Sequence, residues 1–346
     1  MAGIKHLATT IGRDMAERLP KQRKTQRENL SLLVATMVEV RSANTNDLAA
    51  ALPREAERFD MRYQWLSRLL GNPHIDIAEI MAAYGKGLIE HLQAQGQTVI
   101  LMLDQSALGD SFEGLMVSVR VGERALPLLW SAHKTKGAIG FEHQAPLLRA
   151  VAKLLPQGVN VVLMADRFYG TASLVGLCQE FGWSYRIRLK GNLLFHHEGA
   201  LITPQEALDM KIPSLEQARF HNTPITTHIG LLQEKGHPEP WFIAMDQPPS
   251  CYTTLDYGMR WGIEALFSDF KSRGFSLEHT QMRYHDRLER LILVMTLALY
   301  WATSTGMWHQ TTQACPFEKK APKEPFVPCS PSSNAAYAIC STALNA

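Results

Sequence analysis

The chain has 346 residues, of which 46% are hydrophobic and 20% are charged, and its formal net charge is +2. This composition is ordinary for a globular protein, and the length allows two or three domains. The five cysteines are scattered and contain no C-x-x-C pair, which argues against a disulfide framework or a zinc site. No signal peptide is visible, and the apolar run at residues 291–302 is too short to span a bilayer. We expect a cytoplasmic protein without a membrane partner, and the small net charge leaves nucleic acid open as a partner.

Residues 1–97 predict a helical region. The basic run KQRKTQR at residues 21–27 is equally compatible with a solvated tail and with phosphate contacts. Two short helices follow, the first with Asn44 as its cap and the second, FDMRYQWLSRLL, at residues 59–70. Arg62 and other bases alternate with aromatic residues on this second helix. The pair fits a helix-turn-helix-like DNA reader, although helical hairpins are also common as scaffolding.

Two apolar runs that end in an acid predict buried strands. TVILMLD ends at Asp104, and NVVLMAD ends at Asp166. Runs of this kind are typical of strands buried on both faces. An acid at the carboxyl end of such a strand lies at the rim of the sheet, where open α/β sheets place their sites. The two runs therefore predict a site at this rim.

The segments around these strands complete an α/β pattern with a mixed sheet. Residues 115–121 and 125–130 predict an antiparallel meander, and residues 142–155 and 170–181 predict helices. On the strand WSYRIRLK at residues 183–190, Arg188 and Lys190 alternate with apolar residues. An apolar helix at residues 288–308 is expected to pack on the sheet.

Between residues 191 and 250 the sequence changes to short alternating runs with Pro and Gly turns, which predict antiparallel strands. The clearest runs are residues 218–232 and 241–245. Histidines gather here, at positions 196, 197, 221 and 228, but none stands in a zinc motif, so we expect them on the surface or on a strand face. This segment interrupts the α/β domain.

Residues 255–275 have few helix breakers and predict one helix. Counted from Tyr257, the residues Arg260, Glu264 and Lys271 lie at offsets of 3, 7 and 14. At about 100° per residue, all four fall within roughly 60° of one face. A solvated face with casual ion pairs is the alternative interpretation.

Three acids at such positions suit divalent cations. Hard cations such as Mg²⁺ prefer carboxylate oxygens, and paired cations suit in-line displacement at phosphorus. Asp104, Asp166 and Glu264 are therefore the candidate ligands. Arginine, lysine and tyrosine side chains beside them can hold phosphates.

Asp104 in LDQS, Asp166 in ADRFYG and the Y-x2-R-x3-E-x6-K spacing from Tyr257 to Lys271 resemble the DDE transposases of bacterial insertion sequences. The group is the one with the Y-R-E-K signature, the IS-four type, and the resemblance covers about residues 25–320. It implies a ribonuclease-H-like α/β catalytic domain at residues 98–190 and 251–310. It also implies a helical DNA-binding domain at residues 1–97 and an inserted all-β subdomain at residues 191–250.

The resemblance implies cut-and-paste DNA transposition by metal-dependent strand cleavage and strand transfer. Asp104, Asp166 and Glu264 are the implied catalytic residues and would bind two Mg²⁺ or Mn²⁺ ions. The implied partners are the terminal inverted repeats and target DNA, both double-stranded, bound by a homodimer at the bacterial nucleoid. We expect DNA contacts from Tyr257, Arg260, Lys271, Trp241, Arg188, Lys190 and Arg62.

Trp241 matches the position of a base-stacking tryptophan in hairpin-forming relatives, and the alternative is a tryptophan buried in a strand. Residues 323–346 are rich in Pro, Ser and Ala and predict a disordered tail, where the family would have a basic helical ending. Three other functions stay open: a DDE nuclease without strand transfer, a DNA-binding remnant that no longer cuts, and a metallohydrolase acting on small phosphoesters.

Overall fold

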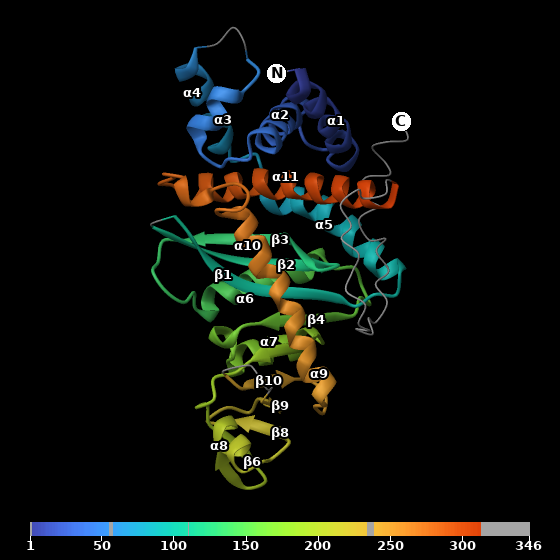
Figure 1. Cartoon of the computed structure of the whole chain (residues 1–346), viewed down its shortest axis with the longest axis vertical. Helices are drawn as coiled ribbons and strands as arrows, with labels where there is room; N and C mark the ends of the chain where they lie inside the picture. The colour runs from blue at the N-terminus through green and yellow to red at the C-terminus, as the bar shows by residue number, and fades with distance from the viewer. Residues whose placement is uncertain (1, 55–57, 110, 234–238, 313–346) are drawn as a thin grey trace, which may run out of the picture. The chain divides into compact units, whose positions relative to one another are not determined.

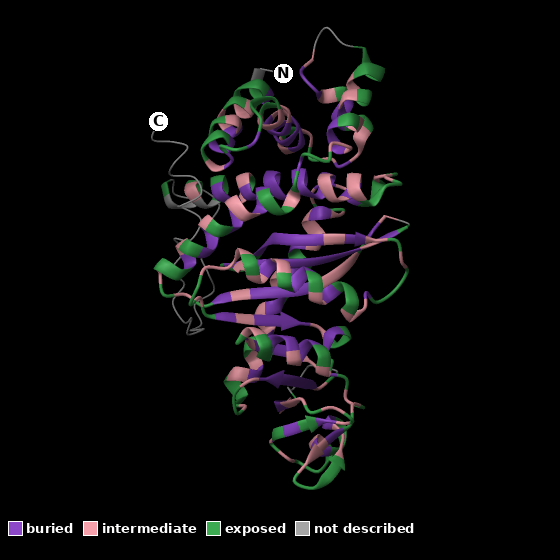
Figure 2. Cartoon of the chain, turned by 180° about the vertical axis from the view of Figure 1, so that it is seen from behind, coloured by how far each residue is buried: buried purple, intermediate pink, exposed green. Residues whose placement is uncertain are grey.

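The structure is a computed structural model that describes residues 2–54, 58–109, 111–233 and 239–312 (Figure 1). Buried residues follow the strands and the inner faces of the helices (Figure 2). In the described ranges, no helix is long and apolar enough to cross a membrane. The predicted disordered tail at residues 323–346 lies outside the described residues.

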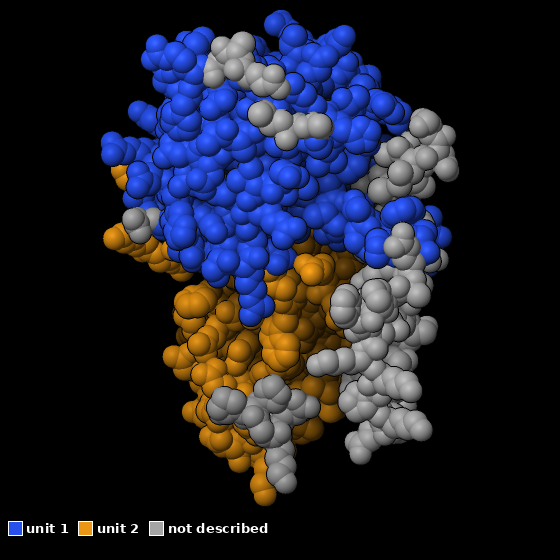
Figure 3. All heavy atoms as spheres, turned by 45° about the horizontal axis from the view of Figure 1, so that its top comes forward, with its two compact units in different colours: residues 1–95, 107–112, 266–346 blue, residues 96–106, 113–265 orange. Residues whose placement is uncertain are grey.

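The chain forms two compact units (Figure 3). Unit 1 takes the described part of residues 1–95, 107–112 and 266–346, and unit 2 takes residues 96–106 and 113–265. Residues from Leu266 onward thus group with the N-terminal helices, whereas the sequence suggested a catalytic domain that extends to residue 310. The functional domain boundaries stay a prediction.

Unit 1 is helical. Its helices are α1 (Ala2–Arg18), α2 (Lys24–Val40), α3 (Thr45–Ala51), α4 (Phe59–Leu70), α5 (Ile77–Ala94) and α11 (His285–Thr312). Asn44 caps α3 as predicted, because its side chain accepts a hydrogen bond from the Asn46 N–H at 2.9 Å. Within the unit, α11 packs against α2, α4 and α5. The expected packing of this helix on the sheet stays a prediction.

Unit 2 is built on one mixed sheet. Its strands are β1 (Val99–Leu108), β2 (Phe112–Val121), β3 (Arg124–His133), β4 (Val161–Ala165), β5 (Ser184–Arg188), β6 (Phe195–His197), β7 (Ala200–Ile202), β8 (Ser214–Phe220), β9 (Thr226–Leu232) and β10 (Trp241–Met245). The strand order is β3-β2-β1-β4-β5-β10-β9-β8-β6-β7. The predicted meander is found in β2 and β3, which pair antiparallel, while β4 pairs parallel with both β1 and β5. This arrangement, with helices α6 (Phe141–Leu154) and α7 (Ala172–Phe181), is consistent with a ribonuclease-H-like domain.

The segment predicted as an all-β insert extends the same sheet. β10 pairs antiparallel with β5 on one side and with β9 on the other. The all-β prediction is wrong at α8 (Pro204–Asp209), where Thr203 and Glu206 form a capping box and Pro204 takes the first helical position. These are standard signals for the start of a helix.

The predicted single helix at residues 255–275 is also wrong. The chain forms α9 (Cys251–Leu255), the 3₁₀ helix η2 (Asp256–Trp261) and α10 (Gly262–Phe270). Glycine weakens a helix, and at Gly262 a Cβ would lie 3.3 Å from the Glu123 carbonyl oxygen. Residues three apart are eclipsed in a 3₁₀ helix, so Tyr257 and Arg260 stay on one side of η2. Lys271 lies beyond the end of α10.

Gly170 lies directly after the 3₁₀ helix η1 (Arg167–Tyr169), and a Cβ added to it would collide with the carbonyl oxygen of Arg188. We expect Gly170→Ala to lower the free energy of unfolding by about 2 kcal/mol, because β5 would have to shift. Gly3→Ala in α1 is the matched control, since a Cβ there has nothing within 4 Å and alanine is the better helix former. Urea denaturation measures both variants. Unchanged stability of Gly170→Ala would contradict the close approach.

Candidate active site

The sheet register places the two candidate aspartates side by side. Leu103 of β1 pairs with Ala165 of β4. Asp104 and Asp166 therefore occupy the next position on two neighbouring parallel strands. The prediction that the first strand ends at Asp104 is wrong, because β1 continues to Leu108. Asp104 instead marks the point where β1 passes the end of β4.

Both carboxylates are oriented by main-chain donors. The Gln105 N–H donates to Asp104 Oδ1 at 2.9 Å, and the Arg167 N–H donates to Asp166 Oδ1 at 2.6 Å. The Tyr257 hydroxyl donates to the same Asp166 oxygen at 3.5 Å. Each carboxylate thus accepts a hydrogen bond from the N–H of the residue that follows it, and Tyr257 from η2 adds a contact to Asp166.

Arg260 connects Asp104 to the third candidate acid. Its Nη1 lies 3.0 Å from Asp104 Oδ2, and its Nη2 lies 2.7 Å from Glu264 Oε1. The residue is only 6% exposed, so its charge faces the acids and not the solvent. Burial pushes the pKa of Arg260 down, but Tyr257 and the three acids outweigh burial and raise it.

Burial raises the pKa of Asp104 to about 6, although the charge of Arg260 opposes this shift.

Tyr169 was not among the predicted residues, yet it is fully buried and its hydroxyl has no hydrogen-bond partner among the described atoms. Burial raises the pKa of Tyr169, and Asp104 and Asp166 raise it further. The phenol stays neutral and lies within the field of both aspartates.

Asp104 and Asp166 fit a divalent-cation site as a pair, whereas the predicted set of three acids with Glu264 does not. Among the described residues, no three His, Cys, Asp or Glu side chains are grouped so that they could hold a metal ion. Asp104 and Asp166 supply adjacent hard oxygen ligands of the kind that Mg²⁺ and Mn²⁺ take. Glu264 is engaged by Arg260, so the three-acid cluster is not assembled in this arrangement.

Two tryptophans, Trp241 and Trp261, lie next to Tyr257 and Arg260. Trp241 is 9% exposed and belongs to a core cluster with Ile243, Met245 and Tyr257. Its ring meets Tyr257 edge-on at 5.4 Å and Trp261 at 6.1 Å. Trp261, which was not predicted, is 50% exposed and directly follows Arg260. The base-stacking role of Trp241 stays a prediction, and of the two rings Trp261 is the one presented to solvent.

The other predicted DNA contacts are distributed over both units. Ile187 pairs with Ala165, so Arg188 takes the position beside Asp166 on β5. Lys190 is exposed two residues later. Arg62 lies on α4 in unit 1, where its Nε is buried without a partner in the described part of the chain, and Lys271 belongs to the same unit.

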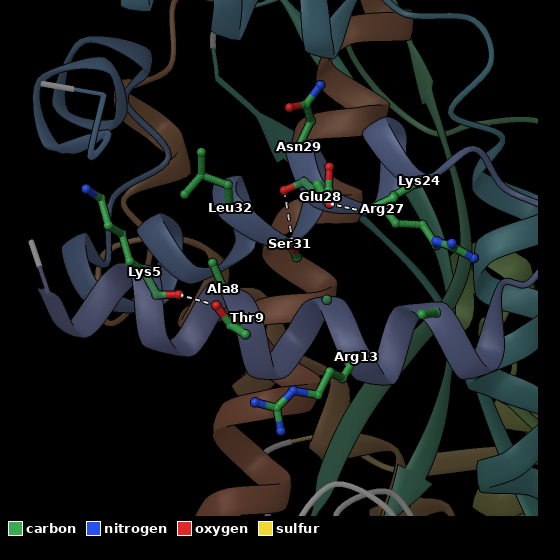
Figure 4. Close-up of a pocket in the computed structure, with 12 residues that line it drawn as sticks. Lys5, Ala8, Thr9, Arg13, Lys24, Arg27, Glu28, Asn29, Ser31 and Leu32 are labelled. Atoms are coloured by element: carbon green, nitrogen blue, oxygen red, sulfur yellow. Dashed lines mark hydrogen bonds and ion pairs between the residues drawn. The ribbon is translucent and has the colours of Figure 1, made fainter. Parts of the chain in front are cut away.

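Unit 1 has a basic groove between α1 and α2, with a volume of about 540 Å³ (Figure 4). Lys5, Arg13, Lys24 and Arg27 line it. The last two belong to the predicted basic run, which continues into α2. Arg27 donates to the Leu19 carbonyl oxygen at 2.9 Å. Lys24 and Arg27 of the basic run therefore lie on the surface of a folded unit.

Residues 133–301 match the family described as transposase DDE domain. The matched range contains Asp166, Glu264 and the residues of the Y-R-E-K spacing, while Asp104 lies before it. The match supports a DDE transposase, a class that generally uses divalent metals. The chain matches no curated protein.

We expect Mn²⁺ binding at the aspartate pair to weaken as the pH falls through about 6, the pKa of Asp104. A proton then competes with the cation for the carboxylate, so the affinity falls about tenfold per pH unit. Titration with Mn²⁺ followed by electron paramagnetic resonance measures this. An affinity that is constant across this pH range would contradict the assignment.

Stability gives an independent control. The pKa of Asp104 rises from its ordinary value of 3.8 to about 6 on folding, so the folded state binds the proton more tightly. The stability gained from that proton is present below pH 3.8 and is lost as the pH rises through about 6. Asp104→Asn should lack this loss when the free energy of unfolding is measured against pH.

Proposed function

We propose that this chain is a transposase that carries out cut-and-paste DNA transposition by metal-dependent strand cleavage and strand transfer at insertion-sequence ends. One observation carries the proposal. Asp104 and Asp166 stand at adjacent strand positions, and Arg260 joins Asp104 to Glu264. One buried arginine thus contacts two of the three acids, next to Asp166, in a domain whose class cuts and joins DNA.

The reaction is an in-line attack by water or a 3′-hydroxyl on a phosphodiester, in which negative charge builds on the attacking and leaving oxygens. Mg²⁺ or Mn²⁺ held by Asp104 and Asp166 would supply positive charge at those oxygens. The N–H groups of Gln105 and Arg167 fix the direction of the two carboxylates. The charge of Arg260 favours the ionised form of Asp104 against the effect of burial, and its second terminal nitrogen binds Glu264.

Affinity for DNA would come from phosphate contacts. Arg188 at the end of β5 and Lys190 two residues later place positive charge beside Asp166. Arg62, Lys271 and the basic groove between α1 and α2 would supply further contacts from unit 1. The DNA partners are the terminal inverted repeats and the target, bound by a homodimer in the bacterial cytoplasm.

A DNA-binding remnant that no longer cuts is the second candidate. The engagement of Glu264 by Arg260 favours it, since a metal site that needs all three acids would require Glu264 to leave this partner. A nuclease without strand transfer differs only in the joining step. Cleavage of an end duplex followed by a joining assay separates these functions.

The test of the proposal uses a labelled duplex that carries the inverted repeats flanking the coding region, incubated with Mg²⁺ and run on a denaturing gel. Asp104→Ala, Asp166→Ala and Glu264→Ala should each reduce cleavage by at least about a thousandfold and leave end binding largely intact. Glu216→Ala is the control, an exposed acid of the same unit. Near-normal cutting by any one of the three variants would remove that residue from the centre, and absence of cutting by the wild type would favour the remnant.

The two tryptophans can be separated by stability. Trp241→Ala should cost about 3–5 kcal/mol because it empties a core position, whereas Trp261→Ala should leave the melting temperature unchanged because its ring is half exposed. An aromatic face that stacks an unpaired base contributes about 1–3 kcal/mol. If second-strand cleavage passes through a hairpin, Trp261→Ala should therefore keep nicking and lose most hairpin product. Equal hairpin yield from Trp261→Ala and the wild type would rule out stacking by Trp261 and leave Trp241 as the candidate of these two rings.

A further inference from the structure

A carboxylate lies on two arginines next to the candidate active site. Glu239 Oε2 accepts a hydrogen bond from Arg167 Nη1 at 3.1 Å and another from Arg188 Nη2 at 3.1 Å. The same Arg188 nitrogen is 3.4 Å from the Pro240 carbonyl oxygen. One oxygen atom therefore stands between two guanidinium groups that come from separate segments of unit 2.

Both arginines are tied to the site. Arg167 follows Asp166 directly, and its own N–H holds the Asp166 carboxylate. Arg188 takes the position beside Asp166 in the sheet register, and its charge lowers the pKa of Tyr257, which burial raises. The two arginines thus belong to segments that hold or adjoin Asp166, whereas Glu239 comes from a separate segment.

Paired guanidinium groups around one oxygen are a typical environment for phosphate. The three residues line a cavity of about 420 Å³ that also contains Lys190 and the exposed ring of Phe168. The Lys190 Nζ lies 5.8 Å from the centre of that ring. The cavity thus offers a third cation and an apolar face beside the arginine pair, which suits a phosphodiester with its sugar.

Glu239 is easy to displace. Its side chain is 58% exposed, that of Arg167 is 45% exposed and that of Arg188 is 19% exposed. Ion pairs of an exposed carboxylate contribute little because water and salt screen them. A DNA phosphate brings its own charge together with neighbouring contacts along the strand, so it can replace the single carboxylate.

We propose that Arg167 and Arg188 form one phosphate-binding site beside Asp166, and that Glu239 occupies it until a nucleic-acid phosphodiester takes its place. The choice of DNA as the source of the phosphate rests on the proposed function. Glu239 then acts as a competitor: it lowers affinity for any isolated anion and favours ligands that bring several phosphates at once.

The test compares Glu239→Gln with Glu216→Gln, which removes the same charge from an exposed position of the same unit. Binding of a labelled duplex is measured by fluorescence anisotropy at low salt in EDTA, so that cleavage plays no part. Glu239→Gln should bind roughly tenfold more tightly than the wild type, as expected for the loss of a carboxylate that competes for two arginines. The gain over Glu216→Gln should shrink as salt is added.

A second background isolates the arginines. When Arg167 and Arg188 are both replaced by Gln, the further change Glu239→Gln should improve binding no more than Glu216→Gln does. Equal affinities of Glu239→Gln and Glu216→Gln in the unmodified background would overturn the proposal, and so would a gain that survives the loss of both arginines.

Heparin chromatography separates this proposal from the function. If no variant binds DNA, the proposed transposase function fails, whereas the anion site is still tested on this polyanion. Elution of Glu239→Gln at higher salt than Glu216→Gln would then support an anion site at the two arginines with another polyanion as its ligand. Co-elution of the two variants would overturn the site as well.

Discussion

The buried charge of Arg260 is the constraint on which the candidate site depends. A guanidinium group that is 6% exposed needs acidic partners, and it finds them in Asp104 and Glu264. Removal of Asp104 from its buried pair with Arg260 would cost about 3–5 kcal/mol. The requirement fixes η2 against β1, because the two partners of Arg260 come from segments more than a hundred residues apart.

The charge of Arg260 also offsets the repulsion between the two aspartates that the sheet register places side by side. Asp104 and Asp166 stand side by side and repel one another, and burial makes the ionised form of Asp104 less favourable still. Arg260 supplies the opposite charge from within the protein. A cation at the aspartates would therefore join a site whose negative charge is already partly compensated, so its affinity reflects both attraction to the acids and repulsion from Arg260.

The parts of this arrangement that the sequence predicts are those with local signals. Apolar runs before Asp104 and Asp166 predict the strands, and the Asn44 cap predicts the start of α3. The local pattern predicts the helical course of residues 255–270 but not the 3₁₀ geometry of residues 256–261. The spacing of Arg260 and Glu264 predicts an ion pair, but its burial comes from tertiary packing. The Glu239 contact joins three separate segments and has no sequence signal. The start of α8 does have one, because Thr203, Pro204 and Glu206 form a standard helix-capping pattern.

The position of β10 in the sheet also has a consequence for how the chain folds. β10 lies between β5 and β9 and pairs with both, so the row of strands stays interrupted until residues 241–245 are in place. Pairings between β5 and β10 span more than fifty residues, and contacts of such separation slow folding because a long loop must close first. During synthesis, β5 leaves the ribosome before β10, so the edge of β5 that pairs with β10 stays unpaired until residues 241–245 follow. The nascent chain therefore exposes an aggregation-prone strand edge beside the residues that later form the site.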